Sequence, residues 1–110
     1  MSDTAWHAVS KGLLTLKKML AKQATQVKTT SKTSDMIMHW LTSLSFLQES
    51  AAEHDIKMVL AHCVEWDLTR KTLVKCFRGN RAKRIEIMTI WKSLMLVLTL
   101  LYDAPQNNTN

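Results

Sequence analysis

The sequence predicts an all-α protein, a compact bundle of about five helices, and three observations lead to this fold class. Chain breakers are rare, since Gly12, Gly79 and Pro105 are the only glycines and proline, whereas a sheet-rich fold needs many tight turns. Apolar residues recur at steps of three and four, as on one face of a helix. With 110 residues and 46% hydrophobic content, the chain suits one domain over 1–110, neither disordered nor membrane-embedded.

The first helix is expected at about 5–22, where Asp3 or Thr4 is placed to cap its N-terminus. Its buried face follows the helical spacing and consists of Trp6, Val9, Leu13, Leu16 and Leu20. The next residues, 23–34, are polar and rich in Thr and Ser. We interpret this segment as a linker between the first and second helices.

A second helix is predicted at about 35–48, capped by Ser34. Its apolar face contains Met36, Trp40, Leu44 and Leu47, with Ile37 and Leu41 beside them. Ser50 and Glu53 have the spacing of a capping box, which predicts a third helix at about 51–65. Its inward residues would be Ile56, Val59, Leu60, Cys63 and Val64.

We expect a break near 66–68 that leaves Trp66 partly exposed, followed by a short fourth helix from Thr69 to Arg78. Gly79 and Asn80 tolerate the left-handed conformation that often ends a helix. A fifth helix is predicted at about 84–102, and 103–110 is interpreted as a flexible polar tail.

The predicted fifth helix is apolar on almost all sides and must therefore be surrounded. It falls short of the ~20 apolar residues that a bilayer requires and has Arg84, Glu86 and Lys92 in or beside it, so we interpret it as a core helix and expect no membrane contact. The other helices can cover only part of it. It is either the central helix of a monomeric bundle or part of a dimer interface, and we expect a homodimer whose interface contains Trp91, Met95, Leu98 and Tyr102.

Basic residues gather between Arg70 and Arg84, in a chain with a net charge of +6. The group comprises Arg70, Lys71, Lys75, Arg78, Arg81, Lys83 and Arg84. Three of them precede or begin the fifth helix, where the helix dipole disfavours cations and favours phosphate. This pattern predicts binding to a nucleic-acid duplex, as DNA or RNA. The alternative is a solvated basic surface that partly pairs with the acids upstream, namely Glu49, Glu53, Asp55, Glu65 and Asp67.

The segment from Leu68 to Asn80 (LTRKTLVKCFRGN) resembles the recognition-helix region of phage-repressor and antitoxin helix-turn-helix proteins. The likeness extends over 59–98, with the first helix of the pair at 59–65. It implies that a set of side chains faces the major groove or its phosphates, namely Thr69, Arg70, Lys71, Val74, Lys75 and Arg78. Asp67 and His62 depart from the family's usual Gly and apolar residue.

Other chemistry receives little support from the sequence. The four His and two Cys residues have no metal-ligand spacing, and no catalytic residues, cofactor or small-molecule substrate are predicted. Cys63 and Cys76 are interpreted as reduced thiols of an intracellular protein, cytoplasmic or nuclear. The alternative function is a helical protein-interaction module, or a viral or plasmid accessory protein, that uses its Met- and Trp-rich surface to bind a protein partner.

Overall fold

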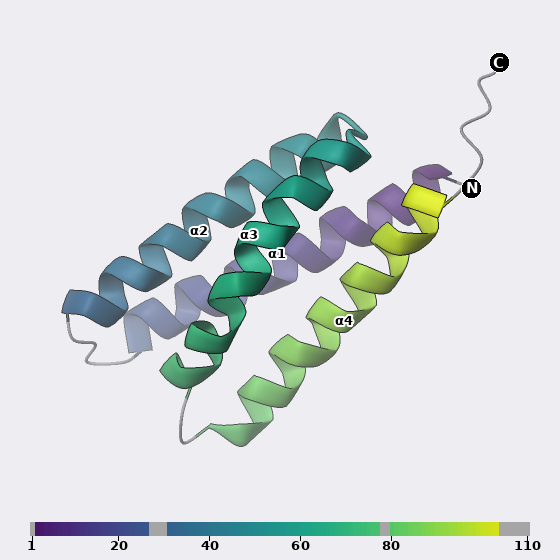
Figure 1. Ribbon diagram of the computed structural model, residues 1–110. Coiled ribbons are helices and arrows are strands. Elements are labelled where there is room, and N and C mark those ends of the chain that lie inside the picture. Colours follow the sequence, from purple (N-terminus) through teal and green to yellow (C-terminus); the bar gives the residue numbers. More distant parts are fainter. Residues whose placement is uncertain (1, 27–30, 78–79, 104–110) are drawn as a thin grey trace, which may run out of the picture.

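The computed structural model describes residues 2–26, 31–77 and 80–103; within these ranges the side chains at 2, 24, 26, 31–34, 67–70 and 72–76 are left aside. The described residues form four helices and no strand: α1 (Ser2–Gln26), α2 (Ser31–Ala52), α3 (Ile56–Cys76) and α4 (Arg81–Asp103). Successive helices run in opposite directions (Figure 1). Packing joins α1 to α2 and α4, and α2 to α3, while α3 packs less extensively against α4. The all-α bundle is thus as predicted, with four helices in place of five.

The predicted break at 66–68 is wrong, because α3 continues through it to Cys76. Trp66 is buried at 1% exposure, where partial exposure was expected, and its ring lies 4.3 Å from that of Trp91 on α4. Burial of so large a side chain outweighs the modest preference of Asp67 and Thr69 for helix ends. The helix-turn-helix pair is not confirmed, since its turn would fall inside α3.

The polar segment at 23–34 is also more helical than expected. α1 extends to Gln26 and α2 begins at Ser31, which leaves 27–30 outside the described residues. The Thr25 hydroxyl donates to the Lys22 carbonyl at 2.8 Å, so this polar side chain is satisfied on the helix itself. α4 is likewise longer than predicted and runs to Asp103, while the remaining predicted tail lies outside the described residues.

A tight turn joins α2 to α3 and replaces the predicted capping box at Ser50 and Glu53. The N–H groups of His54 and Asp55 donate to the carbonyls of Ala51 and Ser50, both at 3.0 Å, and His54 has a φ of 55°. This is a Schellman motif with a left-handed residue after the helix end. Asp55 then caps α3 by accepting from the Met58 N–H at 3.1 Å.

The predicted apolar faces of α1 and α2 are largely confirmed. All five expected α1 residues are buried, and on α2 the buried set is Ile37, Trp40, Leu44 and Leu47. The third helix differs in one position, since Val64 is 66% exposed although it was expected to face inward. α4 buries Ile87, Trp91, Leu94, Leu98 and Leu101.

α4 is less covered than its composition suggests. Only 28% of its most apolar 18-residue stretch is buried in the bundle. The sequence suggested that this helix falls short of the apolar length that a bilayer requires, but α4 as observed, with 23 residues, is long and apolar enough to cross a membrane by length and composition, a criterion that core helices of soluble proteins also meet.

Candidate anion-binding site at the basic end

The predicted basic residues are placed where α3 ends and α4 begins (Figure 1). Lys71 and Arg81 are exposed, while Lys83 and Arg84 are half-buried. Thr69, Arg70, Val74 and Lys75 belong to the last turns of α3, but their side chains are outside the described set. Arg78 lies outside the described residues altogether.

A pocket of about 130 Å³ brings Lys83 together with two lysines from another helix, Lys18 and Lys22 of α1. Met19, Gln23 and Phe77 also line it, and no acid is among the described residues of the lining. The pocket forms because α1 runs antiparallel to α4, which puts the last turns of α1 beside the first turn of α4. We call the described cations here the basic end: Lys18, Lys22, Lys71, Arg81, Lys83 and Arg84.

Sequence reasoning missed Lys18 and Lys22 because they are about 60 residues away from Lys83 along the chain. The available signal was their spacing of four, which puts both on one face of a helix near its end. Chain direction in an up-and-down bundle then brings the end of the first helix next to the start of the last.

The first turn of α4 adds to the positive potential of the basic end. Asn80 caps the helix by accepting from the Lys83 N–H at 3.1 Å, and the first turn contains no acid. The positive end of the helix dipole therefore coincides with three cationic side chains. Arg84 is half-buried, and its Nε is buried without a hydrogen-bond partner among the described residues.

Among the described side chains, few acids neutralise the basic end. Lys83 and Glu86 approach to 3.8 Å with side chains 38% and 49% exposed, so solvent screens the contact and it contributes little. Asp35 is a second exposed acid toward this end, on α2. Phosphate oxygens can therefore compete for most of these cations.

Most of the described acids lie at the opposite end of the bundle, about 30 Å away given 1.5 Å per residue along α3. We call this set the acidic end: Asp3, Glu49, Glu53, Asp55 and Asp103, all exposed. Three of these acids belong to the stretch that was considered as an internal partner for the basic cluster. Their placement rules out that pairing for Glu49, Glu53 and Asp55.

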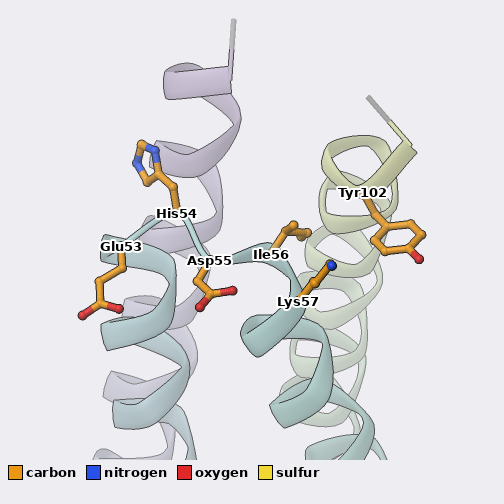
Figure 2. Close-up of a pocket in the computed structure, with 6 residues that line it drawn as sticks. All are labelled: Glu53, His54, Asp55, Ile56, Lys57 and Tyr102. Atoms are coloured by element: carbon orange, nitrogen blue, oxygen red, sulfur yellow. The ribbon is translucent and has the colours of Figure 1, made fainter. Parts of the chain in front are cut away.

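A larger open pocket of about 760 Å³ lies at the acidic end, between the α2–α3 turn and Tyr102 of α4 (Figure 2). The His54 ring points away from the Glu53 and Asp55 carboxylates, so these groups do not converge on one point. His54 instead stacks on Trp6, with ring centroids 5.0 Å apart. No group of His, Cys, Asp and Glu able to hold a metal ion occurs among the described residues.

The residues predicted for a partner interface are divided between core and surface. Trp91 and Leu98 are buried inside the bundle, Met95 is half-buried and Tyr102 is 57% exposed. Other apolar side chains of α4 are also exposed, namely Ile85, Leu96 and Leu100.

Comparison of the chain with protein-family models, with curated proteins and with solved structures finds no match.

Proposed function

We propose that this protein binds duplex nucleic acid through phosphate contacts made by the basic end. The observation that carries the proposal is the pocket in which Lys18, Lys22 and Lys83 come together, with no acid among the described residues that line it. Lys71 near the end of α3 and Arg81 at the start of α4 are exposed at the same end of the bundle. The remaining predicted contact residues on α3, including Arg70 and Lys75, belong to the same proposal.

Electrostatics explains why such an arrangement calls for an anion. Cations of three helices repel one another across the basic end, and those on α4 also oppose the helix dipole. A phosphate backbone relieves both effects at once and releases its own condensed counterions. A duplex supplies many phosphates at regular spacing, which suits cations spread over α1, α3 and α4.

The proposed contact is dominated by the nucleic-acid backbone. The continuous α3 removes the turn on which a repressor-like presentation of the 69–78 segment depends. Lysines grouped in a pocket act as point charges toward phosphate, without the planar fork that reads guanine. We therefore expect little sequence specificity, and binding of duplex RNA as well as duplex DNA.

The test is a titration of fluorescently labelled DNA and RNA duplexes of matched sequence at two salt concentrations. With about five phosphates neutralised, affinity falls about 10²- to 10³-fold between about 50 and 200 mM salt. Salt-independent binding, or no binding to either duplex at the lower salt, overturns the proposal. The second of these results leaves the helical protein-interaction module as the function.

A matched pair of variants on α3 locates the contact. Lys71→Glu and Lys57→Glu each replace an exposed lysine and change the net charge equally, but they lie at opposite ends of the helix. We expect Lys71→Glu to weaken binding and to reduce the salt slope by about one, with Lys57→Glu close to wild type. Equal effects would show that net charge alone attracts the duplex.

A further inference from the structure

The outer face of α4 carries an apolar stripe that the bundle leaves uncovered. Ile85 is 53% exposed, and Leu96 and Leu100 are each 63% exposed. Thr89 and Thr99 share this face, and their hydroxyls donate to the helix carbonyls of Ile85 and Met95, both at 2.8 Å. Because those hydroxyls are satisfied within the helix, the two threonines add to a largely apolar surface.

At both ends of α4 the side-chain charge has the same sign as the end of the helix dipole beside it, which is unfavourable. The N-terminal turn has Arg81, Lys83 and Arg84 and no acid, while the C-terminal turn has Asp103 and no base. Packing within the chain adds to the mismatch, since the lysines of α1 lie beside the cationic end of α4. An oppositely directed second α4 corrects both ends at once, whereas a parallel one would bring like charges together.

A shallow groove of about 210 Å³ borders the stripe between α1 and α4. Gly12, Thr89, Ser93 and Val97 contribute to its mostly apolar lining. The groove lies next to Thr89. At this position along α4, an antiparallel second helix would present one of its own leucines. It is therefore a hole suited to an apolar side chain from a second helix.

We propose that two copies of this chain form an antiparallel, two-fold dimer through the outer faces of α4. In the register that matches the stripe to itself, Ile85 lies opposite Leu100 of the partner subunit. Thr89 lies opposite Leu96 of the partner subunit, which enters the groove, and the cationic first turn meets the partner's Asp103. Both protomers make the same contacts, as a closed two-fold interface requires.

The polar residues of the stripe favour a protein partner over a lipid surface. Lys92 and Ser93 lie at its middle, near the proposed axis, and both are exposed. If α4 spanned a bilayer instead, the charge of Lys92 would lie near the bilayer centre, where it is strongly disfavoured. In a dimer the flexible lysine stem extends sideways to water and covers apolar surface on the way.

Sedimentation analysis of the full chain tests the dimer with two matched variants. Leu96→Asp and Met38→Asp each put a charge on an exposed apolar site, but Met38 is on α2, away from the stripe. We expect a dimer for wild type and for Met38→Asp, and at least about a 30-fold weaker dimer for Leu96→Asp. A monomeric wild type, a larger assembly, or equal effects of the two substitutions overturns the proposal.

Cysteine cross-linking tests the direction of the pair. Residues 85 and 100 are about 22 Å apart on one helix, so only an antiparallel partner brings one next to the other. We expect a covalent dimer from the double substitution Ile85→Cys and Leu100→Cys under mild oxidation. Neither single substitution nor wild type should yield one, and cross-linking by either single variant would show a parallel pair and refute the proposed geometry. The duplex titration is read separately and succeeds or fails independently of these results.

Discussion

Replacing Gly12 with alanine tests how closely α1 and α4 approach at the centre of the bundle. A Cβ atom at this position would lie 2.9 Å from Leu94 Cδ2 and 3.1 Å from Leu94 Cγ. Leu94 is only 4% exposed, so its side chain is confined by the surrounding core. The absence of a side chain at Gly12 therefore allows a packing distance that alanine would disturb.

Two opposing terms set the magnitude of this effect. Alanine in place of glycine within a helix stabilises it by about 1 kcal/mol. Overpacking against Leu94 destabilises the fold by about 1–3 kcal/mol. We therefore expect Gly12→Ala to lower the free energy of unfolding by up to about 2 kcal/mol, despite the better helix former.

A double-mutant cycle with Leu94→Ala separates the two terms, with urea unfolding followed by circular dichroism as the assay. Leu94→Ala alone should lose about 2–5 kcal/mol and also remove the steric conflict. In that background Gly12→Ala should raise the free energy of unfolding by about 1 kcal/mol, so the coupling is about 1–3 kcal/mol. Equal stabilisation by Gly12→Ala in both backgrounds would show that the close approach does not exist.

Further substitutions test the core and the helix ends. Trp91→Ala should destabilise the fold by about 3–5 kcal/mol in urea unfolding, and a loss below about 1 kcal/mol would contradict its burial. Asp55→Ala and Asn80→Ala should each lose about 1 kcal/mol through a lost cap, and unchanged unfolding midpoints would argue against those caps. His54→Val should lower the melting temperature more than His54→Gly. Both substitutions lose the stacking on Trp6, but glycine adopts the positive φ of this position without strain, which offsets part of that loss. A larger decrease for His54→Gly would contradict the proposed turn.

The fold class and most core faces were predictable because they depend on local periodicity. Trp6, Val9 and Leu13 show the pattern: their spacing alone identified a face that is buried. The number of helices was not predictable in this way. Asp67 and Thr69 favour a helix end locally, yet packing of Trp66 on Trp91 keeps α3 continuous, and that contact joins residues 25 positions apart.

The candidate site was half predictable for a similar reason. The cluster from Arg70 to Arg84 is visible in the sequence because its members are neighbours along the chain. Lys18 and Lys22 join it only through the antiparallel packing of α1 on α4, which composition and spacing do not encode. Tertiary direction also separates Glu49, Glu53 and Asp55 from the cations, which removes these three acids, though not the rest of that stretch, as partners for the basic end.

The described charges of the basic end and of the acidic end are separated along the helix axes, so the chain has an electric dipole in addition to its net charge of +6. In the field of a polyanion such a molecule experiences a torque as well as an attraction. The torque orients the molecule before contact, so that Lys18, Lys22 and Lys71 face the polyanion when the two collide. In an antiparallel dimer the two dipoles would cancel. The dimer would then be attracted to the polyanion by its total charge, without a preferred orientation.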